Sequence, residues 1–132
     1  MRKINKIIIH CSDTKTSQSF DISDIDLWHK KRGWSKVGYH YYIKLDGTLQ
    51  RGRDLEEIGA HCRGQNNDSI GICFEGGLNS DGSKWDSPLN EQLLTYDILK
   101  AYLEAIYNGL SVFGHYEFSD VKTCPNFDVD IL

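Results

Sequence analysis

The sequence predicts an α/β fold, with one central mixed β-sheet and helices packed on its faces. Short segments rich in β-branched or aromatic residues predict strands, and two longer segments with apolar residues at helical spacing predict helices. These strands and helices alternate along the chain, which is typical of this class. A chain of 132 residues is long enough for its own hydrophobic core, so we assign residues 1–132 to a single domain.

The N-terminal part contains the first strand and the first helix. Lys6–Cys11 includes three consecutive isoleucines and predicts a buried strand that ends in a histidine and a cysteine. A helix is expected to begin near Asp21 or Ser23, because acidic residues occupy its first turn and basic residues its last, as the helix dipole favours. Gly33 is the expected C-terminal cap of this helix.

A hairpin and a further strand are predicted next. Tyr39–Leu45 is rich in aromatic and β-branched residues, Asp46-Gly47 is a strong turn signal, and Thr48–Arg51 returns as the partner strand. Ser69–Glu75 predicts another strand, which we place at the centre of the sheet.

The second helix is predicted to start at Ser87-Pro88, with serine as the N-cap and proline at the first helical position. Gly109 is expected to follow the helix, Val112-Phe113 forms a short strand, and a turn or two of helix closes the chain. One apolar stripe predicts the face that contacts the sheet: Leu89, Leu93, Tyr96, Leu99, Leu103 and Ile106.

Composition and charge exclude several classes of protein. The formal net charge of −4 gives no electrostatic footprint for nucleic acid, and no apolar segment reaches transmembrane length. The apolar segment Ile7–Ile9 is too short for a signal peptide, so we expect a protein made in the cytoplasm that leaves by another route. Without export, the four cysteines are expected to be free thiols or metal ligands rather than disulfides.

The segment Gly114–Pro125 carries the strongest chemical signal, with a histidine, a lysine and a cysteine in one loop. Imidazole nitrogen and thiolate sulfur are normal zinc ligands, and a catalytic zinc needs three protein ligands and one open position. The loop supplies His115 and Cys124. His10 is the best candidate for the third ligand, because it also ends an apolar strand and two such histidines converge if their strands are neighbours.

A simpler interpretation of the same residues stays open at this point. A lone histidine after a strand is most often a surface or hydrogen-bonded residue, and a lone cysteine is most often a small buried hydrophobe. The spacing between His115 and Cys124 also matches no structural zinc signature.

A series of short motifs extends the argument over nearly the whole chain. They occur in this order: Ile8-Ile9-His10-Cys11-Ser12, Trp28-His29-Lys30, Gly33-Trp34, Val37-Gly38-Tyr39-His40, Ile43-Lys44-Leu45-Asp46-Gly47-Thr48, Gly52-Arg53-Asp54, Gly59-Ala60-His61, Asn67-Asp68-Ser69-Ile70-Gly71-Ile72-Cys73 and Lys122-Thr123-Cys124-Pro125. Together they resemble the type-2 N-acetylmuramoyl-L-alanine amidases and the related peptidoglycan recognition proteins, and most closely the amidase-type phage lysozymes.

This resemblance implies a zinc amidase that cuts the bond between N-acetylmuramic acid and the L-alanine of the stem peptide in peptidoglycan. Carried over position by position, it implies that His10, His115 and Cys124 bind one Zn2+ per chain. Tyr39, which follows Val-Gly, matches a catalytic tyrosine, and Lys122, two residues before the cysteine, matches a catalytic lysine. Such a lysine can stabilise an oxyanion, and such a tyrosine can orient water or pass a proton.

The resemblance also suggests residues that contact the substrate. His61 lies in a Gly-Ala-His-Cys segment that resembles the rim of the family's cleft, and Asn67 and Ser69 are further candidates for the cleft wall. The other histidines have simpler interpretations: His29 is expected to be a surface or packing residue, and His40 to be structural because it alternates with Tyr39.

Two other functions compete with the enzyme. A non-catalytic peptidoglycan-binding module of the same family would lack a ligand, and a structural zinc domain would need a fourth one. All three ligands are present and no convincing fourth exists, so we favour the enzyme. The expected partner is peptidoglycan, with no nucleic acid or membrane partner, and we expect a monomer. The missing signal peptide fits a phage or prophage endolysin that a holin releases to the cell wall.

Overall fold

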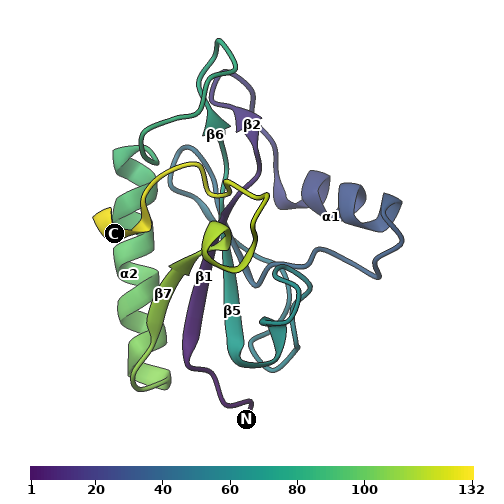
Figure 1. Ribbon diagram of the computed structural model, residues 1–132, viewed down its shortest axis with the longest axis vertical. Coiled ribbons are helices and arrows are strands. Elements are labelled where there is room, and N and C mark those ends of the chain that lie inside the picture. The colour runs from purple at the N-terminus through teal and green to yellow at the C-terminus, as the bar shows by residue number, and fades with distance from the viewer.

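A five-stranded mixed sheet forms the centre of the computed structural model, which describes residues 1–132, with the strand order β4-β3-β5-β1-β7. Figure 1 labels three of its neighbouring strands, β5, β1 and β7. β5 is parallel to both β1 and β3, β1 is parallel to β7, and β4 is antiparallel to β3. The strands have these bounds: β1 Lys6–Cys11, β3 Tyr41–Ile43, β4 Leu49–Arg51, β5 Ser69–Phe74 and β7 Ser111–Gly114. The predicted mixed sheet, its hairpin and its central strand are therefore confirmed.

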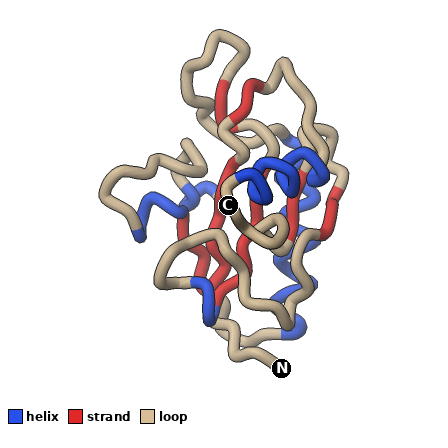
Figure 2. Tube along the Cα trace, turned by 90° about the vertical axis from the view of Figure 1, so that its right-hand side faces the viewer, coloured by secondary structure: helices blue, strands red, loops and turns tan.

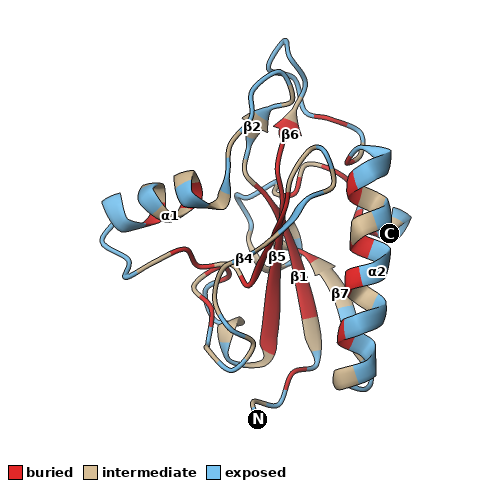
Figure 3. Cartoon of the chain, turned by 180° about the vertical axis from the view of Figure 1, so that it is seen from behind, coloured by how far each residue is buried: buried red, intermediate tan, exposed pale blue.

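The two helices cover opposite faces of this sheet (Figure 3). Helix α2, Asn90–Ile106, packs its buried side chains against Ile7 and Ile9 of β1 and their neighbours on β5. Helix α1, Ile22–Lys31, contacts the other face through Ile25, which packs against Tyr42 and Cys73. Complete burial of an aliphatic side chain stabilises a fold by roughly 1.5–3 kcal/mol, so the α2 face supplies most of the hydrophobic stabilisation.

A second, two-stranded sheet, which the sequence did not predict, lies beyond the carboxyl ends of β1 and β5 (Figure 2). β2, Thr14–Lys15, is parallel to β6, Gly77–Leu78. The pairing exists because both chains leave the central sheet side by side, and the Ser12 N–H still donates to the Phe74 carbonyl at 3.0 Å. The β2–β6 pairing therefore fixes the path of the backbone that follows β1.

Local signals account for the ends of α1. Asp21 is the N-cap, and its backbone N–H donates to the Asp24 carboxylate at 2.9 Å, which is half of a capping box. Gly33 follows the helix with φ of +91°, a conformation that favours glycine. Both features confirm the predicted helix.

Three short 3-10 helices complete the chain: η1 Asn66–Asp68, η2 His115–Phe118 and η3 Val129–Ile131. The last one confirms the helical turn predicted for the tail. Neither α1 nor α2 combines the length and the apolar character that a membrane crossing requires.

The predicted start of α2 is wrong by two residues, because the helix begins at Asn90 rather than at Pro88. Ser87 does not cap the helix, because its hydroxyl donates to the Pro88 carbonyl at 3.0 Å, and Leu89 becomes the N-cap with its side chain exposed. The buried Gln92 takes the sheet-facing place that the apolar stripe assigned to Leu89. Its amide accepts from the Leu89 N–H at 3.0 Å and donates to the carbonyls of Ile43 and Glu75 at 3.1 and 2.9 Å. One polar side chain therefore ties the helix to the ends of β3 and β5.

Replacement of this side chain gives the first testable prediction. Gln92→Leu leaves one N–H and two carbonyls without a partner in a buried place, so the free energy of unfolding should fall by about 2–4 kcal/mol. Denaturant unfolding measures this change. The exposed neighbour provides the control, because Glu91→Gln should alter stability by no more than ~0.5 kcal/mol. A loss below about 1 kcal/mol for Gln92→Leu would show that the helix is held by its apolar contacts alone.

Candidate active site

A cleft of about 540 Å³ opens above the carboxyl ends of β1 and β7, on the α1 face of the sheet. Its walls come from five parts of the chain that are far apart in sequence: the end of β1 and its exit, helix α1, the loop before β3, the segment before η1 and the loop after η2. They supply His10, Cys11, Ser12, Asp13, Ile25, Trp28, His29, Arg32, Trp34, Tyr39, Ala60, His61, Arg63, His115, Val121, Lys122, Thr123, Cys124 and Asn126.

The register of the sheet brings the two histidines together. β1 pairs with β7 so that Ile9 faces Gly114, and the residue that follows each of these two in the chain is a histidine. The ring centroids of His10 and His115 lie 4.7 Å apart. The expectation that the two strands are neighbours is therefore confirmed, and parallel pairing is its physical cause.

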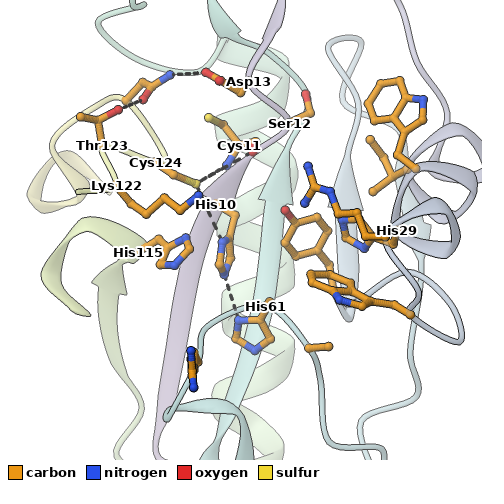
Figure 4. A pocket seen from close by; sticks show the side chains of 18 of the residues that line it. His10, Cys11, Ser12, Asp13, His29, His61, His115, Lys122, Thr123 and Cys124 are labelled. Atoms are coloured by element: carbon orange, nitrogen blue, oxygen red, sulfur yellow. Dashed lines mark hydrogen bonds between the residues drawn. The ribbon is translucent and has the colours of Figure 1, made fainter. Parts of the chain in front are cut away.

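Cys124 completes a three-residue group (Figure 4). Its Sγ atom lies 3.8 Å from Nδ1 of His10 and accepts the backbone N–H of Cys11 at 3.2 Å. One nitrogen or sulfur atom from each of His10, His115 and Cys124 lies within 4.8 Å of the others. The sequence prediction that these three residues converge thus agrees with the geometry.

The surroundings favour the protonation states that metal ligands need. Hydrogen bonding with Cys11, and then with the two histidines, lowers the pKa of the Cys124 thiol well below its ordinary value. Burial lowers the pKa of His10, which keeps its imidazole neutral. A metal binds the thiolate and the neutral imidazole, so both shifts favour a bound cation.

The donor set fits zinc in particular. Two imidazoles and one thiolate are ordinary zinc ligands, and three protein ligands leave one position open for chemistry. Zinc–sulfur and zinc–nitrogen bonds in a tetrahedral site separate the two donor atoms by roughly 3.6 Å. The 3.8 Å between the Cys124 sulfur and the His10 nitrogen is close to that value.

The loop that carries Cys124 is held by polar contacts to the exit of β1. Asn126 donates to the Asp13 carboxylate at 3.0 Å and to the Gly77 carbonyl at 3.2 Å, and accepts from the Thr123 hydroxyl at 2.8 Å. Asp13 and Asn126 both have positive φ, of 57° and 66°. These contacts hold two residues of left-handed backbone conformation in place, one after β1 and one after Cys124.

Tyr39 and Lys122 both line the cleft beside this group. The half-buried Tyr39 ring lies 5.0 Å from the His10 ring, and burial raises the pKa of its phenol, so the hydroxyl stays protonated. Lys122 is exposed, and its side chain extends toward Cys124 and His10 (Figure 4). Their positions are compatible with the roles that the resemblance implies.

The three residues expected to contact the substrate have different positions. His61 lines the cleft but is only 7% exposed. Ser69 is fully buried, and its hydroxyl donates to the Gln65 carbonyl at 2.6 Å. Asn67 is exposed and lies outside the cleft lining. The structure thus brings neither Ser69 nor Asn67 to the cleft lining, because Ser69 is the buried first residue of β5 and Asn67 belongs to η1, which precedes that strand.

Several cleft residues were not assigned a role from the sequence. Trp28, Trp34, Arg32 and Arg63 line the wall, and Arg32 lies over the Trp34 ring at 5.9 Å. His29 is buried, where its Nδ1 atom accepts the Gly38 N–H at 2.9 Å, and burial lowers its pKa to about 4. The motifs that contain Trp28 and Trp34 were visible in the sequence, but only the fold shows which face of α1 meets the cleft.

Comparison with known proteins identifies the family. Residues 1–127 match the model of the Amidase_2 family, described as N-acetylmuramoyl-L-alanine amidase. The chain belongs to this family. It is 42% identical over 124 residues to the endolysin of Escherichia phage T7, which covers 93% of this chain and 81% of that protein.

Solved structures agree with this assignment. The N-acetylmuramoyl-L-alanine amidase LysC from Clostridium intestinale URNW is similar with a TM-score of 0.84 and 32% identity, over 98% of this chain and 83% of that one. Drosophila PGRP-LB is similar with a TM-score of 0.80 and 25% identity, over 95% of this chain and 76% of that one. The fold predicted from the sequence is therefore confirmed.

The contacts of Asn126 generate a prediction for the Cys124 loop. Glycine tolerates the φ of +66° at this position, whereas alanine pays a steric cost of ~1–2 kcal/mol there. Asn126→Ala should therefore be less stable than Asn126→Gly by about 1 kcal/mol, and thermal or denaturant unfolding measures the difference.

The first residue of α2 serves as the control for this comparison. At Asn90 the usual order should hold, with Asn90→Ala more stable than Asn90→Gly, because alanine is the better helix former. If alanine proved at least as stable as glycine at position 126, the left-handed conformation there would not be required by the fold.

Proposed function

We propose that this protein is a zinc-dependent N-acetylmuramoyl-L-alanine amidase that hydrolyses the bond between N-acetylmuramic acid and L-alanine in peptidoglycan. The observation that carries the proposal is the convergence of His10, His115 and Cys124 in a cleft, in a chain of the amidase family. The relative from phage T7 is named an endolysin, which supports the same role for this chain. It would act as a monomer on the cell wall, after release from the cytoplasm by a holin.

His10, His115 and Cys124 would hold one zinc ion per chain. When bound, zinc supplies a Lewis acid that polarises an amide carbonyl and lowers the pKa of water toward ~7. The neutral imidazoles and single thiolate leave net positive charge at the site, which suits this role. The sheet register and the Asn126 contacts would hold these three side chains close together before the metal binds.

Lys122 and Tyr39 would act on the reacting amide. The Lys122 ammonium lies at the mouth of the cleft and would stabilise the negative charge that develops on the carbonyl oxygen. The protonated Tyr39 hydroxyl would orient the attacking water and donate or accept a proton. Both residues contribute most in the transition state, so they raise turnover more than affinity.

The charges of the cleft also suit peptidoglycan. Arg32, Arg63 and Lys122 line it, while Asp13 is the one acidic side chain among its lining residues, although the whole chain carries a net charge of −4. A locally positive cleft attracts the carboxylates of a peptidoglycan stem peptide. Trp28 and Trp34 offer apolar surface for the remainder of the muropeptide.

The non-catalytic alternative is a peptidoglycan-binding module on the same fold. Such a module needs the cleft but no complete ligand set and no group aimed at an oxyanion. Here all three ligand residues, Tyr39 and Lys122 surround one cleft, so hydrolysis explains more of the structure than binding does.

Metal removal tests the zinc proposal. Metal analysis of the purified protein should give about one zinc per chain, and chelation should abolish the release of new L-alanine amino termini from purified cell wall until zinc is added back. Cys124→Ala should lose the zinc. Cys62→Ala, which removes a buried thiol outside the cleft, should keep it. Full activity of a metal-free preparation would overturn the proposal.

Two substitutions test the catalytic roles. Tyr39→Phe removes only a hydroxyl and Lys122→Ala removes one charge, and each should lower kcat on muropeptides by about a hundred- to a thousandfold. Zinc content, Tm and KM should change little, since the interaction is strongest in the transition state. Lys3→Ala is the matched control, because Lys3 is exposed and lies outside the cleft. Turnover near that of the wild type in either variant would refute the role of that residue.

A further inference from the structure

A chain of hydrogen bonds between buried side chains starts at His10 and continues through His61 (Figure 4). Nε2 of His10 lies 2.9 Å from Nδ1 of His61, and Nε2 of His61 lies 3.2 Å from the Ser69 hydroxyl. The Ser69 hydroxyl in turn donates to the Gln65 carbonyl at 2.6 Å. His10, His61 and Ser69 are 1%, 7% and 0% exposed, so water does not compete for these contacts.

The direction of each hydrogen bond follows from the last member of the chain. The Gln65 carbonyl can only accept, so the Ser69 hydroxyl hydrogen is used there and its oxygen accepts from Nε2–H of His61. A neutral His61 then carries its lone pair on Nδ1, which accepts a hydrogen from Nε2 of His10. His10 is left with its lone pair on Nδ1, the atom that faces the Cys124 sulfur at 3.8 Å.

We propose that His61 is a positioning residue, which fixes His10 in the Nε2–H tautomer and so presents Nδ1 to the metal. This inference rests on the proposed zinc site. Histidine ligands of metals are commonly oriented through their second ring nitrogen by a carboxylate, a carbonyl or water. Here a second histidine, His61, is the group that orients the His10 ring. Its own proton is kept on Nε2 by the Ser69 hydroxyl, which in turn donates to the Gln65 carbonyl.

The protein backbone is shaped to hold the His61 ring. A Cβ atom at Gly71 would lie 2.6 Å from Cγ of His61, and one at Gly59 would lie 2.6 Å from Cδ2. Glycine weakens the interior of a strand, yet Gly71 stands in the central strand β5, where it leaves room for this ring. The backbone N–H of His61 also donates to the side-chain oxygen of Asn66 at 3.0 Å, and this bond fixes the backbone of His61.

The same contacts argue against a direct role for His61 in substrate binding. Both ring nitrogens are engaged with protein groups, and the side chain is almost fully buried. Without a free nitrogen the ring can offer the substrate only its edge. The expectation that His61 contacts the substrate is therefore replaced by a role that acts through His10.

Zinc affinity and the histidine tautomers test this inference without an activity assay. In metal-free wild-type protein, long-range 15N–1H correlation spectra should show His10 as the Nε2–H tautomer. His61→Leu removes both nitrogens, and its zinc Kd from chelator competition should rise by ~10–100-fold. His61→Asn keeps an acceptor near Nδ1 and should recover most of the affinity. Ser69→Ala removes the acceptor for the Nε2 hydrogen of His61, and it should weaken zinc binding less than His61→Leu does.

A matched control removes a buried hydrogen bond elsewhere on the same face of the sheet. The Tyr42 hydroxyl donates to the Phe20 carbonyl at 2.9 Å and lies outside the cleft, so Tyr42→Phe should leave the zinc Kd unchanged. Steady-state kinetics add a second criterion. A positioning residue should change kcat at limiting zinc and leave KM unaltered, whereas a substrate contact should raise KM.

Three results would overturn the inference: an Nδ1–H tautomer of His10, a wild-type zinc Kd in folded His61→Leu, or a raised KM with unchanged Kd. If His61→Leu does not fold, the wild-type spectrum and the Kd values of His61→Asn and Ser69→Ala decide the question. Failure of the proposed function is distinguishable, because a zinc-loaded protein that does not cleave peptidoglycan would leave the tautomer and affinity results unaffected.

Discussion

The parallel pairing of β1 with β7 is the interaction on which the candidate site depends. Its register sets Ile9 opposite Gly114, so the next residues, His10 and His115, lie side by side. It also places the Cys11 N–H at the end of the ladder, where the Cys124 sulfur accepts it. A shift of one residue in this register would turn His10 toward the apolar face and destroy the group.

The two faces of the sheet differ in composition: one supplies most of the apolar packing, and the other carries the polar groups of the candidate site. The face toward α2 is filled by aliphatic and aromatic side chains of β1, β5 and the helix. The opposite face carries a smaller apolar cluster around Ile25 and several buried polar groups, among them His10, His40 and His61. Each of these histidines has partners for its ring nitrogens, and burial lowers the pKa of His40 to about 4, which keeps its imidazole neutral.

Loops that are distant in sequence make the walls of the cleft, and two of them are held by hydrogen bonds to other segments of the chain. The Cys124 loop is tied to the exit of β1 through Asn126 and Asp13, and the Trp85 indole donates to the Pro125 carbonyl at 3.0 Å. The segment that carries His61 is tied to the turn before β5 through Asn66. A rigid sheet with pinned loops suits a site whose groups must keep a fixed geometry through a reaction.

Local patterns in the sequence were sufficient for the strands, for α1 with its acidic cap, and for the Asp46-Gly47 hairpin, because these depend on neighbours within a few residues. Residue chemistry and family motifs were sufficient to select His10, His115 and Cys124. Tertiary structure alone decided that Gln92, not Ser87, organises the start of α2, that Ser69 is buried and Asn67 lies outside the cleft, and that His61 lies within hydrogen-bonding distance of His10. These outcomes depend on which polar groups become buried together, and contacts between residues far apart in sequence, such as His10 and His61, leave no periodicity or spacing that the sequence could display.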